Sequence, residues 1–313
     1  MVLWNYYLKN ILKNKSFLLI INPVSGLKQG SQNINFIINF FKNYDIIIDI
    51  FSTDYKGHAK EYLSNIDNQK YSTLIIYGGD GTFNEAVNGI LCRGDNYMPN
   101  IGFLPGGSGN SVMHHLKYLN LQDACHSIVQ NQIIDIDIMQ IKYDNHIEYS
   151  INMLGWGMVS DIGILAEKLR WLGPVRYNVA SLYYILNKRY RSANIIIDNK
   201  QFDGQYLFIL VANTKYTGKG MMVAPEAELD DSLLDLILVQ DNISRIQLMQ
   251  LLPKLFTGEH ITSPYVQYQK IKSLDINSKQ YDLLNIDGEI YGNTPVSINI
   301  LDKKLPIYYS RIL

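Results

Sequence analysis

Residues 73–82 read TLIIYGGDGT, an apolar run that passes directly into a glycine-rich turn. A short apolar run ending at glycine is typical of a buried parallel strand, and residues 82–91 then have helical spacing. Glycines let the backbone approach a phosphate, and the first amides of a helix attract anions. An acidic Asp80 in that turn fits a magnesium ligand or a proton acceptor; the alternative is a residue that caps the following helix.

The alternation of strands and helices extends over the first half of the chain. Further elements are expected at residues 16–22, 32–41, 46–52, 57–65 and 100–104. This pattern predicts an α/β fold with a parallel sheet, whose ligands bind at the carboxyl ends of the strands. We therefore expect a nucleotide-binding domain over residues 1–134.

The second half has a different pattern, with strands that mostly follow one another directly. Helical spacing is confined to residues 160–190 and 244–256. Residues 136–143 and 147–153 are expected to be the first two strands of this half. We predict an antiparallel, β-rich domain over residues 135–295.

Composition excludes several classes of protein. Of 313 residues 47% are hydrophobic, the formal net charge is −1, and nothing global points to nucleic acid as a partner. Two isolated cysteines give no disulfide framework, which fits a reducing cytosol. The sequence shows no signal peptide and no apolar run near the ~18 residues of a membrane helix. A cytoplasmic protein is expected, and a membrane lipid would have to be reached from the water side.

Two later motifs add chemistry. Residues 105–110, PGGSGN, form a second phosphate-sized loop with a hydroxyl donor at Ser108, and the two loops together favour a nucleotide site. The P-loop signature and the HRD and DFG motifs of protein kinases are missing from the sequence. Asp287 and Glu289 flank a glycine after an apolar run and could face one metal–phosphate site; the alternative is an ordinary turn.

At this point the sequence resembles a family, the catalytic region of diacylglycerol kinases and sphingosine kinases. The resemblance rests on five ordered blocks: Asn22-Pro23-x-Ser25-Gly26, Gly78–Thr82, Pro105–Asn110, Ala224-Pro225 with Asp230-Asp231, and Asp287-Gly288-Glu289. It implies a Rossmann-like nucleotide domain related to NAD kinase and phosphofructokinase, followed by an antiparallel β-sandwich with the lipid site. It also implies that a C-terminal segment, about residues 296–313, returns to the first domain.

The resemblance implies a transfer of phosphate from ATP, with Mg²⁺, to a diacylglycerol-like or sphingoid lipid. The implied ATP contacts are Asn22, Thr53, Gly78, Gly79, Asp80, Gly81, Thr82, Asn84, Glu85, Gly107, Ser108, Gly109, Arg170 and Arg176. Asp80 matches the proton acceptor of sphingosine kinases, and Glu289 matches that of bacterial diacylglycerol kinases. Asp80, Asp287 and Glu289 could together surround one magnesium ion.

A second, structural magnesium site of the bacterial relatives matches Glu228, Asp231 and Leu233. Ser232 stands where the family usually has glycine, so a solvated acidic turn is the alternative. Residues 167–177, EKLRWLGPVRY, look like a sphingosine kinase segment. In sphingosine kinases an Asp-x-Asp pair precedes this segment, and Asp161 matches its first acid. The resemblance therefore implies that Asp161 is a substrate-binding residue. Gly163 replaces the second acid, which leaves a protonated amine without its obvious partner.

Residues 168–191 contain six basic residues, several aromatic residues and no acid. Such a stretch could lie on an anionic bilayer, and the alternative is a helix packed on the second domain. The sequence thus predicts a peripheral lipid kinase that meets its lipid substrate at a membrane surface, with a homodimer as a possible assembly. Two alternatives stay open: an NAD-kinase-type enzyme with a soluble substrate, and a non-catalytic lipid-binding module.

Overall fold

The computed structural model describes residues 16–23, 30–67, 70–218, 220–302 and 304–309. The described residues form two compact units: the first contains those up to residue 136 and those from 304 to 309, and the second contains those from 137 to 302. The change from one unit to the other lies two residues beyond the predicted boundary at 134. The helices in the described ranges are all too short or too polar to cross a membrane.

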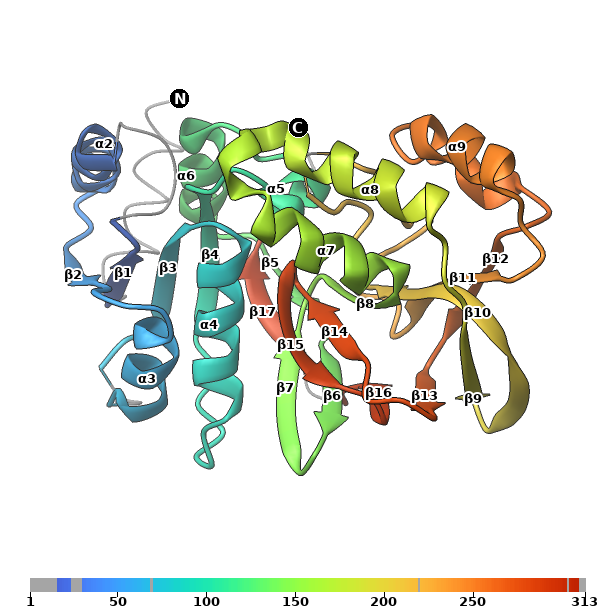
Figure 1. Ribbon diagram of the computed structural model, residues 1–313. Coiled ribbons are helices and arrows are strands. Elements are labelled where there is room, and N and C mark those ends of the chain that lie inside the picture. The colour runs from blue at the N-terminus through green and yellow to red at the C-terminus, as the bar shows by residue number, and fades with distance from the viewer. Residues whose placement is uncertain (1–15, 24–29, 68–69, 219, 303, 310–313) are drawn as a thin grey trace. The chain divides into compact units, whose positions relative to one another are not determined.

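The first unit is built on a six-stranded sheet with the order β2-β1-β3-β4-β17-β5 (Figure 1). All neighbours run parallel except β17 and β5. The strands are β1 (Phe17–Ile21), β2 (Ile48–Ser52), β3 (Thr73–Gly78), β4 (Asn100–Pro105), β5 (Ile133–Ile136) and β17 (Leu305–Tyr308). β1 and β3 are buried along their whole length, as expected for central parallel strands.

Helices connect these strands. They are α2 (Gly30–Lys42), α3 (His58–Asn65), α4 (Asp80–Leu91), α5 (Ser111–Leu116) and α6 (Leu121–Val129). α4 packs against β3 and α6 packs against β4. The glycine turns that begin at Gly78 and Pro105 therefore each follow a parallel strand, at the carboxyl edge of this sheet.

The second unit is an antiparallel sheet with the main order β15-β14-β8-β10-β9-β13-β16-β6-β7, while β11 pairs with β10 and β12. Its strands are β6 (Met139–Tyr143), β7 (His146–Ser150), β8 (Met153–Gly157), β9 (Arg191–Ile197), β10 (Lys200–Ala212), β11 (Leu234–Gln240), β12 (Gln267–Ile271), β13 (Ser273–Ser278), β14 (Leu283–Ile286), β15 (Glu289–Asn293) and β16 (Val296–Ile300). Its helices are α7 (Met158–Lys168), the 3₁₀ helix η1 (Arg170–Val175), α8 (Arg176–Leu186), α9 (Arg245–Lys254) and the 3₁₀ helix η2 (Glu259–Thr262).

Three predicted segments need correction. Residues 136–143 are not one strand, because β5 ends at Ile136 in the first sheet and β6 begins at Met139 in the second. Residues 147–153 are likewise divided between β7 and β8. The segment that enters the first sheet starts later than residue 296, because Val296 and Ile298 of β16 are buried in the core of the second unit. β17 is the part that pairs with β4 and β5.

Candidate active site

Two glycine turns contact each other at the carboxyl ends of β3 and β4. The amide of Gly106 donates a hydrogen bond to the carbonyl oxygen of Gly78 at 2.8 Å. A Cβ atom on Gly107 would lie 2.4 Å from the Cα atom of Gly79. Only glycine allows this approach of backbone to backbone. The result is an edge of the sheet without side chains, of the kind that binds phosphate groups.

Polar groups surround this edge. The side chain of Asn22, directly after β1, donates to the hydroxyl of Thr82 on α4 at 3.1 Å. The amide of Thr53, directly after β2, donates to the carbonyl of Ile21 at 2.9 Å. Ser108 is exposed in the second turn. The structure therefore brings the predicted nucleotide contacts of the first unit to one edge; Ser25 and Gly26 lie outside the described residues.

Glu85 and Asn84 have contacts inside the first unit. The carboxylate of Glu85 accepts a hydrogen bond from the amide of Gly57 at 2.8 Å, where φ of 92° begins α3. The side-chain oxygen of Asn84 accepts a hydrogen bond from the side-chain Nδ2 of Asn88 at 3.3 Å. Glu85 thus fixes the start of α3, a role that the sequence analysis missed. Its contact with ATP remains a prediction.

Asp80 is the first residue of α4, but its carboxylate binds the start of a different helix. It accepts from the backbone amide of Ser111 at 3.1 Å, from the Ser111 hydroxyl at 3.2 Å and from the Val112 amide at 3.4 Å. The alternative of a cap on the following helix is thus wrong, because Asp80 caps α5. Burial raises the pKa of this carboxyl above its usual value, although these hydrogen bonds act in the opposite direction.

Asp287 and Glu289 occupy one tight hairpin between β14 and β15. Asp287 and Gly288 both have positive φ, 52° and 89°, which is the conformation of a two-residue type I′ turn. The buried carboxylate of Asp287 accepts from the Ser150 hydroxyl at 2.6 Å and from the Met153 amide at 2.9 Å. Glu289 is exposed. The two acids therefore have different surroundings: Asp287 fixes the hairpin to β8, and Glu289 faces solvent.

Arg170 and Arg176 pair with a single carboxylate. The Arg170 side chain, 74% exposed, lies 2.5 Å from Glu167, and Arg176 lies 3.4 Å from it. This shared carboxylate brings the two guanidinium groups to one place at the end of α7. Their predicted contact with ATP phosphates is not tested by this geometry.

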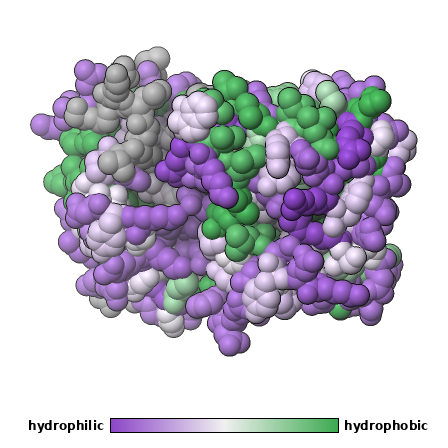
Figure 2. Space-filling view, viewed as in Figure 1, coloured by the Kyte–Doolittle hydropathy of each residue, from purple (hydrophilic) through white to green (hydrophobic). Residues whose placement is uncertain are grey.

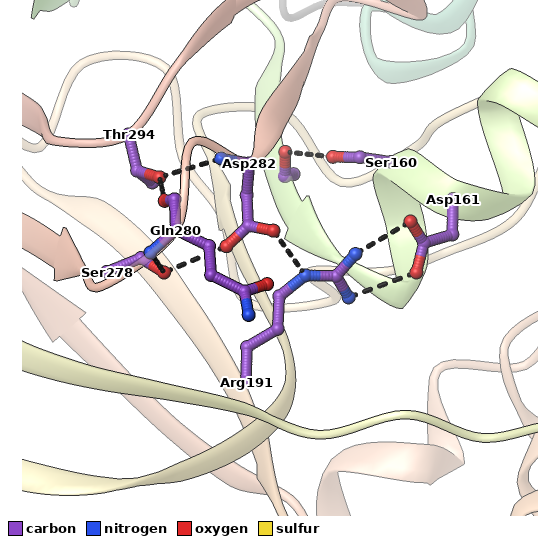
Figure 3. Close-up of polar contacts among 8 residues, drawn as sticks. Ser160, Asp161, Arg191, Ser278, Gln280, Asp282 and Thr294 are labelled. Carbon is purple, nitrogen blue, oxygen red and sulfur yellow. Dashed lines mark hydrogen bonds and ion pairs between the residues drawn. The ribbon is translucent and has the colours of Figure 1, made fainter.

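Asp161 belongs to an ion-pair network (Figure 3). Arg191 donates two hydrogen bonds to its carboxylate, at 3.0 and 2.8 Å, and a third to Asp282 at 2.8 Å. All three side chains are less than a fifth exposed. In the sequence Arg191 is only one basic residue of a stretch and Asp282 has no local signal, since Arg191 lies 30 positions from Asp161 and 91 from Asp282.

The turn at Glu228, Asp231 and Leu233 contains an ion pair, and the structural magnesium site expected there stays a prediction. Asp231 pairs with Lys270, and its other oxygen accepts from the Leu233 amide at 3.0 Å. Ser232 adopts the positive φ, 61°, that glycine takes more readily. Among the residues that the structure describes, no three His, Cys, Asp or Glu side chains are placed to hold a metal. Lys270 supplies the positive charge at this turn.

The sequence matches two known family profiles. Residues 16–141 match the diacylglycerol kinase catalytic domain, and residues 153–309 match the YegS C-terminal NAD kinase beta sandwich-like domain. The chain belongs to the diacylglycerol kinase family. Membership makes this protein a lipid kinase at the family level.

Curated relatives agree with this family, and a solved structure has the same fold. The chain is 26% identical to sphingosine kinase 1 of Arabidopsis thaliana, over 97% of this chain and 74% of the relative. It is 27% identical to the diacylglycerol kinase of Staphylococcus carnosus, over 93% and 94% of the two chains. A putative diacylglycerol kinase structure from Bacillus anthracis has a TM-score of 0.79 at 23% identity, covering 95% of this chain and 98% of that chain. This likeness bears out the predicted fold class, an α/β unit followed by an antiparallel β-sandwich-like unit.

Proposed function

We propose that this lipid kinase transfers the γ-phosphate of ATP to a hydroxyl of a diacylglycerol-like lipid. The observation that carries the proposal is the close packing of the two glycine turns at the carboxyl ends of β3 and β4, where a Cβ atom on Gly107 would lie 2.4 Å from the Cα atom of Gly79. Mg²⁺ supplies charge neutralisation when it is bound with the nucleotide. It commonly takes only one or two carboxylates together with phosphate oxygens, so a complete protein cage is not needed.

The described contacts suggest different tasks for the acidic residues. Asp80 is held by two amides of α5 and is suited to orienting the second glycine turn. Glu289 is an exposed carboxylate on a hairpin that Asp287 holds rigid. We propose that Glu289 accepts the proton of the attacking hydroxyl. Asp80 and Asp287 position the surrounding turns and bind magnesium together with the nucleotide.

A neutral acceptor is favoured over a sphingoid base. Arg191 already neutralises Asp161, so this carboxylate is not available to a protonated amine. A Cβ atom on Gly163 would lie 2.8 Å from Ile290 Cδ1 and 3.0 Å from Asn285 Nδ2, so a longer acidic side chain would not fit without rearrangement. A sphingoid base is the second candidate, because the likeness to sphingosine kinase 1 extends over 97% of the chain.

The test is phosphate transfer from labelled ATP with Mg²⁺ to mixed micelles of diacylglycerol, sphingosine, ceramide or no added lipid. We expect diacylglycerol to be the best acceptor and Glu289→Gln to reduce transfer by about 10²–10⁴-fold. Glu226→Gln, another exposed glutamate of the same unit, is the matched control and should retain activity. Phosphorylation of NAD instead, or no consumption of ATP, would overturn the proposal in favour of a soluble-substrate kinase or a binding module.

A further inference from the structure

Helix α8 has two apolar faces, and one of them is exposed. Ala180 and Ile185 are buried, and Ile185 belongs to a core cluster of the second unit. The opposite stripe follows the spacing i, i+4, i+7, i+8, i+11 and is 41–55% exposed; its members are Val175, Val179, Leu182, Tyr183 and Leu186. A surface helix normally has polar residues on its outer face, so this stripe calls for a partner.

Helix α9 continues the same surface. Leu248 is buried in the core cluster that also contains Ile185, whereas Ile246, Met249 and Phe256 are 70%, 47% and 56% exposed. Arg245 at the start of α9 donates to the carbonyl of Leu186 at the end of α8, at 2.8 Å. The two helices lie side by side over the second unit (Figure 1), and hydrophobic surface gathers over α8 (Figure 2).

We call these exposed side chains of α8 and α9, with the flanking Val175 and Phe256, the α8–α9 face. Trp171 of the adjoining η1 helix is 79% exposed. Together, η1, α8 and α9 contain nine of the twenty large hydrophobic side chains that are exposed in the described part of the chain, and Phe256, just after α9, is a tenth. Scattered exposed hydrophobic residues are normal, but this concentration on three adjoining helices is typical of a contact surface.

The two segments that carry this face contain basic residues and no acids, while the exposed Asp241 and Glu259 lie just outside the second segment. No acid occurs in residues 168–191 or 244–256. Three of the six basic residues of the first segment are already paired with acids in the structure. Arg170 and Arg176 pair with Glu167, and Arg191 pairs with two aspartates. Arg189 beside α8 and Lys254 on α9 are exposed. A basic rim around an apolar and aromatic face matches the surface of an anionic bilayer, where Tyr and Trp lie at the headgroup level.

We propose that the α8–α9 face docks on an anionic lipid bilayer, with its apolar side chains in the headgroup boundary and Arg189 and Lys254 near lipid phosphates. The bilayer is then the partner surface of the proposed kinase. The proposed function explains why the protein would dock there, but the docking itself is argued from the surface alone. Helix α8 itself is held to the rest of the unit by its buried stripe, so docking requires no unfolding. Membrane binding can therefore be measured apart from catalysis.

The experiment is co-sedimentation of the full chain with vesicles of phosphatidylcholine alone, or of equal parts phosphatidylcholine and phosphatidylglycerol, with no kinase substrate added. Two double variants remove the apolar contacts, Leu182→Gln with Leu186→Gln on α8, and Met249→Gln on α9 with Phe256→Gln just after it. Phe202→Gln on β10 of the same unit, 47% exposed, is the matched control. Exposed positions tolerate such changes with little loss of stability.

We expect tight binding only to the anionic vesicles. Each double variant should bind at least about tenfold more weakly, because it loses several methylene groups that docking would bury in the bilayer. Phe202→Gln should bind as the wild type does. Arg189→Gln with Lys254→Gln should weaken binding, as should salt that shortens the Debye length from about 10 to about 3 Å.

Unchanged binding of both apolar double variants, or equal and salt-independent binding to both vesicles, would overturn the proposal. A change from dimer to monomer in the α8 double variant, without an effect on vesicles, would also overturn it and assign the face to a second copy of the chain. If no lipid is phosphorylated but the variants still lose vesicle binding, the proposed function fails and the docking surface stands.

Discussion

The carboxylate of Asp80 lies 3.1 Å from the backbone nitrogen of Ser111, the first residue of α5. Asn110, which precedes that helix, cannot cap it, because its side-chain oxygen accepts from the Gly107 amide at 2.9 Å. Asp80 therefore joins the first glycine turn to the helix that follows the second. This one acidic side chain thereby fixes the position of the two phosphate-sized turns relative to each other.

This capping contact predicts different effects for two substitutions of Asp80. Asp80→Ala leaves the first amides of α5 without an acceptor and should lower the free energy of unfolding by about 1–2 kcal/mol. Asp80→Asn retains one acceptor oxygen and should cost less than half as much. Urea unfolding of both variants measures the difference, and equal stability of the two would contradict the capping role.

The close approach of the two glycine turns predicts that Gly107→Ala weakens nucleotide binding. The added Cβ would lie 2.4 Å from Gly79 Cα, so the backbone must shift at the site itself. Overpacking of this kind costs about 1–3 kcal/mol, which corresponds to roughly ten- to a hundredfold in ATP affinity. Titration calorimetry with ATP checks this. Gly94→Ala, which meets no atom within 4 Å, is the control and should bind ATP normally.

The Asp287-Gly288-Glu289 hairpin predicts a separation of stability from activity. Asp287→Ala leaves the buried Ser150 hydroxyl and Met153 amide without their acceptor and should destabilise the fold by about 1.5–3 kcal/mol. Glu289→Ala changes an exposed residue and should alter stability by no more than about 0.5 kcal/mol while it removes activity. Thermal unfolding and lipid phosphorylation, measured on the same samples, test both statements. A large loss of stability in Glu289→Ala would argue against the assigned roles.

The Asp161–Arg191–Asp282 network predicts a stability loss when its central cation is removed. Arg191→Met leaves two carboxylates, 15% and 9% exposed, without their shared partner. Breaking a buried pair in this way typically costs about 3–5 kcal/mol, and the partial exposure here reduces the expected loss to about 2–4 kcal/mol. Arg189→Met, an exposed arginine on the same segment, is the control for denaturant unfolding and should differ little from the wild type.

Asp235 predicts a dependence of stability on pH. Burial raises the pKa of this carboxyl to about 6, although the Tyr268 hydroxyl donates a hydrogen bond to it. The folded-state pKa is above the unfolded value, so the contribution of Asp235 is fully present below about pH 4 and is lost as pH rises through 6. Relative to Asp235→Asn, the wild type should therefore become more stable, by up to about 3 kcal/mol, as pH falls from 8 to 4. Parallel unfolding curves of the two proteins across this range would contradict the shift.

Local patterns predicted the strands β1 to β4 and the helices α2 to α4 of the first unit, but not α5, α6 or β5. The predicted strand at residues 73–77 is β3, and the expected helix at 82–91 is α4 with two more residues at its start. The conformation of a continuous apolar run or of a glycine depends mainly on neighbours in the chain, so it can be predicted without knowledge of the tertiary fold. The order of the glycine and acidic motifs was also sufficient to indicate the kinase family.

The sequence by itself thus determined the α/β unit, the glycine turns at its strand ends, and the family. Only the tertiary structure decided which helix Asp80 caps, that Arg191 neutralises Asp161, that Lys270 pairs with Asp231, and that the outer stripe of α8 stays exposed. Turn and strand propensities act over a few residues, whereas the partner of a charge and the burial of a helix face depend on long-range sheet pairing. A count of charges along the chain cannot distinguish a cation that is already paired from one that remains exposed to a membrane.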